Sequence, residues 1–133
     1  MSINTVGIVG SGIMAGGLTE VVARRGHQVI VRARKQAGAE ATVADIAANL
    51  DKQVSRDKLG TDERDATLAR ISATDSLDAL AGCDLVIENV VEDLDIKKGL
   101  FAELGAIVQP SAILATNTST LPVVDLAVAS GRP

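Results

Sequence analysis

A glycine-rich stretch near the start of the chain limits the folds that this sequence can adopt. Residues 6–17 read VGIVGSGIMAGG, an apolar run followed by Gly-x-Gly-x-x-Ala and then a helix-like pattern. Gly10 permits a tight turn because a residue without a Cβ can take backbone angles that are closed to other residues. Ala15 stands where a third glycine often lies, and its small side chain still lets a helix pack closely on a strand. The stretch predicts a buried strand that turns sharply into a helix.

The same turn predicts a dinucleotide-binding site. Gly12 lets a backbone amide approach a pyrophosphate, and the free amides and positive dipole end of the new helix face the phosphates. The alternative is an ordinary structural turn, but its place at the start of a strand–helix–strand pattern favours dinucleotide binding. The cofactor-binding residues expected here are Gly10, Ser11, Gly12, Ile13 and Met14.

Size and composition indicate one globular domain over residues 1–133. The chain is 47% apolar and 23% charged, which is not the composition of a disordered segment. Its net charge is −4 and Phe101 is its one aromatic residue, so basic patches and stacking platforms for nucleic acid are not expected. We predict no metal site.

Cysteine usage and hydropathy indicate a cytoplasmic location. Cys83 is the only cysteine, so no internal disulfide can form, which fits a reducing compartment. The sequence shows no signal peptide and no apolar run long enough to span a bilayer, so we expect no membrane partner.

Strand-like apolar runs alternate with helix-like patterns along the chain. The predicted strands cover residues 3–9, 27–32, 71–74, 83–89 and 113–116, and the predicted helices cover residues 12–25, 37–55, 61–69, 75–80, 94–108 and 122–129. This alternation predicts an α/β fold, a doubly wound parallel sheet with helices on both faces.

Two details of these helices can also be predicted. Thr61 and Asp75 are expected to cap the helices that they precede. The first helix is expected to turn one apolar face to the core, formed by Met14, Leu18, Val21 and Val22.

The end of the second strand bears on the choice of cofactor. An acidic residue at this place accepts hydrogen bonds from the ribose 2′-hydroxyl of NAD, but Ala33 fills it here. Arg32, Arg34 and Lys35 flank Ala33, and cations favour the 2′-phosphate of NADP. The sequence therefore favours NADP over NAD, the alternative being a solvated charge run and weaker NAD binding.

Ligands of such sheets bind at the carboxyl ends of the strands, where the strand order switches. Three polar clusters follow predicted strands, at residues 10–12, 89–93 and 117–119, and we expect them to converge there. His27 begins its predicted strand and so lies at the opposite end from these clusters, which indicates a structural role.

Three motifs together resemble a known family. They are GSGIMA at residues 10–15, DLVIENVVED at 84–93 and NTSTL at 117–121. In this order and spacing they resemble the N-terminal, Rossmann-type NAD(P)-binding domain of L-3-hydroxyacyl-CoA dehydrogenases, including 3-hydroxybutyryl-CoA dehydrogenases. The resemblance covers essentially the whole chain. It implies hydride transfer between an L-3-hydroxyacyl thioester and its 3-oxoacyl form, as in fatty-acid metabolism.

The resemblance also implies residue roles. Glu92 and Lys97 would contact the cofactor, although an exposed surface pair is the alternative. Asn117 would lie near the nicotinamide, and Ser119 would hydrogen-bond the oxygen of the substrate, unless it merely caps the last helix. The other implied contacts are Asn89 and Val90 lining the cofactor site, and Asn49 and Arg56 approaching the CoA portion.

The family's pattern extends further than these residues. Its catalytic histidine, its C-terminal helical domain and the interface of its expected homodimer lie beyond residue 133, so we expect this chain alone to bind cofactor but to turn over poorly. The acyl carrier, CoA or a carrier protein, is left open. Two alternatives also stay open: a β-hydroxyacid dehydrogenase type of NADP domain, and a module that binds or senses NADP(H) without catalysis.

Overall fold

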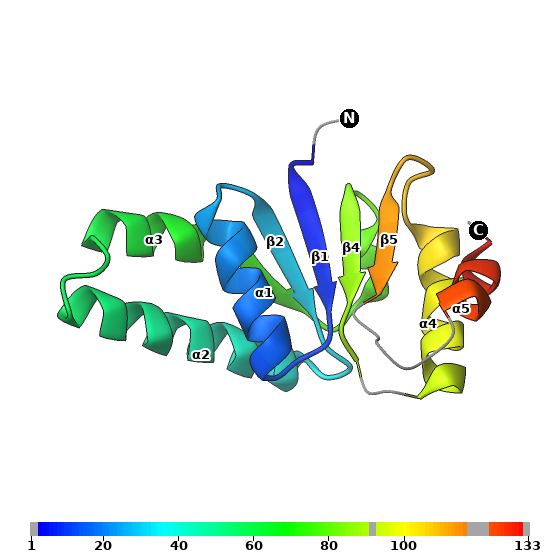
Figure 1. Ribbon diagram of the computed structural model, residues 1–133, viewed down its shortest axis with the longest axis horizontal. Coiled ribbons are helices and arrows are strands. Elements are labelled where there is room, and N and C mark those ends of the chain that lie inside the picture. Colours follow the sequence, from blue (N-terminus) through cyan, green and yellow to red (C-terminus); the bar gives the residue numbers. More distant parts are fainter. Residues whose placement is uncertain (1–2, 91–92, 117–122, 132–133) are drawn as a thin grey trace.

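The computed structural model describes residues 3–90, 93–116 and 123–131 as a parallel five-stranded sheet with helices packed on it (Figure 1). The strands are β1 (Thr5–Val9), β2 (Gln28–Arg32), β3 (Ile71–Thr74), β4 (Leu85–Glu88) and β5 (Ile113–Thr116). The helices are α1 (Ile13–Arg24), α2 (Gln36–Ser55), α3 (Thr61–Ala69), the short 3-10 helix η1 (Leu77–Leu80), α4 (Leu94–Ile107) and α5 (Val123–Ser130). The predicted strands and helices are all present, with ends shifted by up to two residues.

The strand order is β3-β2-β1-β4-β5. The chain therefore runs outward from β1 through β2 and β3, and then returns to the other side of β1 for β4 and β5. This reversal makes the sheet doubly wound, as predicted, and places the switch point between β1 and β4.

Two apolar clusters show that both faces of the sheet are covered. On one face, Val6, Ile8 and Val31 pack with Ala15 of α1 and Ala39 of α2. On the other face, a second cluster combines sheet residues with residues of η1 and α4, among them Val9, Val86, Leu80 and Leu104. Within the described residues no helix is both long and apolar enough to cross a membrane.

The face that α1 turns to the sheet agrees only in part with the predicted one, because Leu18 and Val22 pack against the core as expected. Small residues, Ala15, Thr19 and Ala23, are buried there, whereas Met14 and Val21 are more than half exposed. Small side chains let the helix backbone come close to β1, which is what the Gly-x-Gly-x-x-Ala pattern requires. Apolar spacing alone did not identify these small residues.

The two predicted helix caps were wrong. Thr61 is the first residue of α3, and its N-cap is Gly60, which has no capping side chain. The residue that precedes η1 is Ser76 rather than Asp75, and its backbone N–H donates to Thr74 Oγ1 at 3.1 Å.

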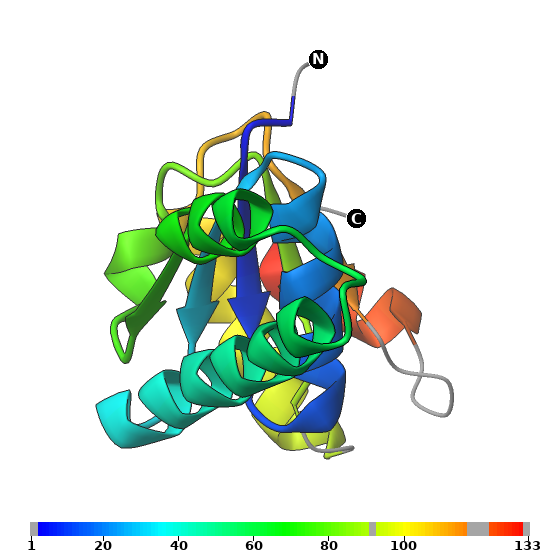
Figure 2. The same ribbon diagram turned by 90° about the vertical axis from the view of Figure 1, so that its left-hand side faces the viewer.

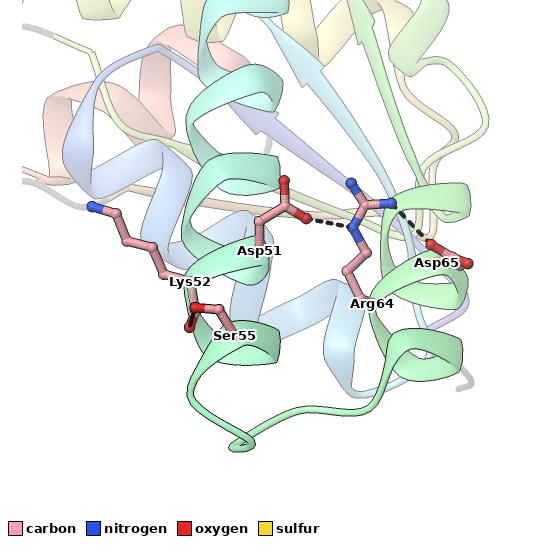
Figure 3. A network of polar contacts seen from close by, with 5 residues as sticks. All are labelled: Asp51, Lys52, Ser55, Arg64 and Asp65. Atoms are coloured by element: carbon pink, nitrogen blue, oxygen red, sulfur yellow. Dashed lines mark hydrogen bonds and ion pairs between the residues drawn. The ribbon is translucent and has the colours of Figure 1, made fainter.

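The α2 and α3 helices form an arm that extends beyond the β3 side of the sheet and lies toward the viewer in Figure 2. Arg64 of α3 joins the two helices, because its Nε lies 2.8 Å from Oδ1 of Asp51 in α2 (Figure 3). Its Nη1 lies 2.9 Å from Oδ1 of Asp65 in α3 itself. Ile46, Leu50 and Leu59 form a third apolar cluster in this arm.

A carboxylate ties the strands together at the amino edge of the sheet. Asp84 Oδ2 accepts from the backbone N–H groups of Asn4 at 2.9 Å and Thr5 at 3.0 Å, and Asp84 Oδ1 accepts from Gln109 Nε2 at 3.1 Å. The two backbone donors lower the pKa of Asp84. The ionised form is therefore the one that joins the start of β1 to the start of β4.

We predict that Asp84→Asn lowers thermal stability at neutral pH but not in strong acid. A carboxylate with a lowered pKa stabilises the fold above its unfolded-state pKa of ~3.9, and this contribution is lost as pH falls through the folded-state pKa. Melting temperatures of wild type and variant, measured from pH 7 down to pH 2, should converge. A constant gap over this range would contradict the assignment.

Candidate cofactor site

The strand ends meet at one edge of the sheet. In the parallel register Val9 aligns with Arg32 and with Glu88, and Glu88 aligns with Thr116. The segments that begin at residues 10, 33 and 89 therefore all leave from the same edge, as predicted for the first two polar clusters. The last strand, β5, also ends at this edge with Thr116. The third predicted cluster, residues 117–119, lies outside the described residues.

Gly10 stands where the backbone that leaves β1 lies close to the backbone that leaves β4. Its φ is +136°, and a Cβ added there would overlap the carbonyl oxygen of Asn89. The Gly10 N–H donates to the carbonyl of Arg32 at 2.8 Å, and the Asn89 N–H donates to the carbonyl of Val9 at 2.8 Å. A side chain at position 10 would push the two strand ends apart.

Gly12 leaves open space at the start of α1. Its φ is +95°, and no heavy atom lies within 4 Å of a Cβ built on it. It is the N-cap residue of α1, no side chain caps this helix, and the first turn contains no acidic residue. Uncapped amides, the positive end of the helix dipole and empty space fit a diphosphate. Next to them the side chain of Ile13 is 94% exposed.

The end of β2 presents fewer available cations than its sequence indicates. Ala33 is buried, and the Nε of Arg32 donates to the carbonyl of Asp75 at 3.1 Å. Arg34 and Lys35 are exposed. Arg32 thus ties β2 to the turn after β3, and Arg34 and Lys35 are the cations most accessible to a ligand.

A buried ion pair lies at the end of β4. Lys97 Nζ of α4 is 3.0 Å from Glu88 Oε2, and the two side chains are 1% and 0% exposed. The alternative of an exposed Lys97 is thereby excluded, while its contact with the cofactor stays a prediction. Sequence reasoning assigned no role to Glu88, although a charged residue ending a buried apolar strand is a signal that a partner must be near.

The two residues predicted to approach CoA lie along α2. Asn49 is exposed and donates from Nδ2 to Glu20 Oε1 of α1 at 2.6 Å. It lines a hollow of about 280 Å³ between α1 and α2, whose other lining residues include Gly12 and Ile13. Arg56 is the exposed C-cap residue of α2, a helix whose 20 residues span roughly 30 Å. Arg56 follows Asn49 by seven residues, so it lies about 10 Å further along the helix axis than the part of α2 that faces Gly12.

Two reactive residue types lie at the amino edge instead. His27 directly precedes β2, as predicted for a structural residue. Cys83 is buried before β4, and burial raises the pKa of its thiol to about 11. A thiol with this pKa is un-ionised at neutral pH and is a poor nucleophile.

Three predicted site residues, Glu92, Asn117 and Ser119, lie outside the described residues. Asn89 and Val90 are both half-buried. The carbonyl of Asn89 lies against Gly10, and Val90 is the next residue along the chain. The structure thus brings together residues 10–14, 88–90 and 97 near the switch point, with residues 32–34 on the other side of β1.

Comparisons with known proteins agree with this geometry. Residues 5–133 match the family described as "3-hydroxyacyl-CoA dehydrogenase, NAD binding domain". A probable 3-hydroxybutyryl-CoA dehydrogenase of Deinococcus radiodurans is 44% identical over 127 residues, which are 96% of this chain and 45% of the relative. The 3-hydroxybutyryl-CoA dehydrogenase of Bradyrhizobium diazoefficiens is 38% identical over 98% of this chain and 45% of its own length.

Solved structures show the same likeness. FadB2 of Mycobacterium tuberculosis superposes with a TM-score of 0.93 at 41% identity, over 97% of this chain and 46% of that one. The (S)-3-hydroxybutyryl-CoA dehydrogenase PaaH1 of Ralstonia eutropha gives 0.94 at 35% identity, over 98% and 46%. The chain thus spans about half the length of the relatives it matches, and it belongs to the NAD-binding domain family of the 3-hydroxyacyl-CoA dehydrogenases.

Proposed function

We propose that the chain is the cofactor-binding part of an enzyme that interconverts L-3-hydroxyacyl-CoA and 3-oxoacyl-CoA. The observation that carries this proposal is the turn at Gly10 and Gly12, which presents an uncapped helix and open space at the switch point of the sheet. Membership of the family supports the reaction and a CoA thioester as substrate. When bound, a nicotinamide dinucleotide supplies the hydride acceptor or donor.

The residues of the chain divide the work between binding and orientation. The amides at the start of α1 bind the diphosphate, and the segments after β4 and β5 orient the nicotinamide and the substrate. Asn117 and Ser119 take the positions beside the reacting atoms, with Ser119 donating to or accepting from the substrate oxygen. A base must accept the hydroxyl proton. His27 is at the opposite edge, so we place this base outside the 133 residues.

We further propose that NADP(H) binds more tightly than NAD(H). No carboxylate is present at position 33 to accept bonds from a ribose 2′-hydroxyl, and Arg34 and Lys35 are exposed just after β2. A guanidinium can bind a phosphate through two charge-assisted hydrogen bonds. The same two cations have little to bind on an unmodified ribose.

A glycine substitution tests the cofactor site. Gly12→Ala is expected to weaken dinucleotide binding at least tenfold, because its Cβ would occupy the space offered to the diphosphate. The readout is the dissociation constant from fluorescence titration of NADH and NADPH. Gly26→Ala is the matched control, since Gly26 has a φ of +99°, open space and a place at the other end of α1.

Both alanine variants bear a similar cost of placing a Cβ at positive φ. The control should therefore lose stability but bind the dinucleotides as wild type does. Equal losses of binding in the two variants, or none in Gly12→Ala, would show that the glycine turn is structural only.

A second titration tests the choice of cofactor. Arg34→Ala should weaken NADPH binding severalfold and leave NADH binding within twofold, because only NADPH carries the 2′-phosphate. Arg32→Ala should have the smaller effect, since the Arg32 Nε already donates to Asp75. Arg25→Ala, an exposed arginine at the far end of α1, is the control. The proposal is wrong if NADH binds at least as well as NADPH and neither Arg32 nor Arg34 alters the ratio.

A further inference from the structure

Glu88 accepts three bonds in a place where a carboxylate has no access to water. Its Oε2 lies 3.0 Å from Lys97 Nζ and 2.7 Å from the backbone nitrogen of Val90, and its Oε1 accepts from Thr116 Oγ1 at 2.5 Å. The partners come from α4, from the segment after β4 and from the last residue of β5. One side chain therefore joins the three elements that border this side of the carboxyl edge.

The contacts of Glu88 reach the glycine turn in two steps. The carboxylate holds the N–H of Val90, and the carbonyl of the preceding residue, Asn89, lies against Gly10. The segment that touches the turn is thus fixed from behind by Glu88. The bond to Thr116 fixes the point from which the chain continues to residue 117.

Stability alone is a weak reason for a buried ion pair. Moving both charges out of water costs much of what their attraction returns, and uncharged replacements of similar shape are often neutral or stabilising. A pair with two further hydrogen bonds does, however, hold its neighbours in one arrangement. Its place beside the switch point then suggests that the arrangement serves the ligand.

The fold also indicates which half of the ligand is served. In a fold of this kind the diphosphate of a bound dinucleotide would lie over the start of α1, and the segment after β2 would face the adenosine ribose. The other half of a dinucleotide extends across β1 toward β4 and β5, which is where Glu88 lies. Glu88 is therefore placed to act on the nicotinamide half and not on the adenosine half.

We propose that Glu88 is a positioning residue for the nicotinamide half of the cofactor, acting through Lys97, Val90 and Thr116. This inference rests on the proposed dinucleotide binding. It assigns no contact between Glu88 and the ligand, because the carboxylate is fully buried behind its partners.

The test compares a whole dinucleotide with a fragment that lacks nicotinamide. The probes are NADH or NADPH, whichever binds wild type more tightly, and the ADP-ribose that carries the same 2′ group. The variants of the complete chain are Glu88→Gln, Lys97→Met and the two combined. The double variant has lost both charges of the pair, and its glutamine can still form hydrogen bonds with Val90 and Thr116. It is therefore expected to fold, and it can be measured even if a single variant unfolds.

We expect each single variant to weaken the dinucleotide at least tenfold and the fragment less than twofold. We expect the double variant to be no weaker than the weaker single variant, because residues that act through one another give non-additive effects. Asp84→Asn is the control, since Asp84 precedes the same strand at the opposite edge and also holds backbone N–H groups. It should bind both probes as wild type does.

Three results would overturn the inference. The first is a folded Glu88→Gln variant that binds the dinucleotide within twofold of wild type. The second is an equal loss of dinucleotide binding and fragment binding. The third is a double variant that does not fold. Each of the last two results would mark the ion pair as structural. If the wild-type chain binds neither probe, the result would instead contradict the proposed function, and with it this inference.

Discussion

The close approach of two backbones, at Gly10 and Asn89, is the constraint on which the rest of the site depends. No Cβ fits between them, and the hydrogen bonds from Gly10 to Arg32 and from Asn89 to Val9 hold three strand ends at one level. The carboxyl ends of β2, β1 and β4 consequently form one edge. The uncapped start of α1 faces the same edge because α1 begins three residues after Gly10.

The two edges of the sheet are fastened by different chemistry. At the amino edge Asp84 is partly exposed and accepts from backbone donors, so water can replace some of these bonds. At the carboxyl edge Glu88 is fully buried and is paired with an ammonium group. The bonds of Glu88 are therefore less open to competition from water than those of Asp84.

Much of the fold could be predicted because its signals are local. Apolar runs, glycine turns and helical spacing indicated every described strand and helix, and the strand ends followed from the parallel order. The face of α1 was predicted only in part, since hydrophobic spacing also selected the exposed Met14 and Val21, while the close approach to β1 selects small residues such as Ala15 and Ala23. The ion pair of Glu88 was also missed, because Lys97 reaches it only after α4 has packed on the sheet. The choice among the arginines after β2 required the contact of Arg32 with Asp75.

The spacing of Asp84 and Glu88 has a consequence for how β4 finds its place. The two carboxylates flank the apolar residues 85–87, and four positions separate them, so they belong to the same side of the strand. A slip of β4 by one residue would turn every side chain to the other side and carry Glu88 away from Lys97 and into apolar surroundings. Mispaired arrangements of β4 between β1 and β5 would therefore bury a lone charge. The two acidic groups thus favour the observed register of β4 over a slip by one residue.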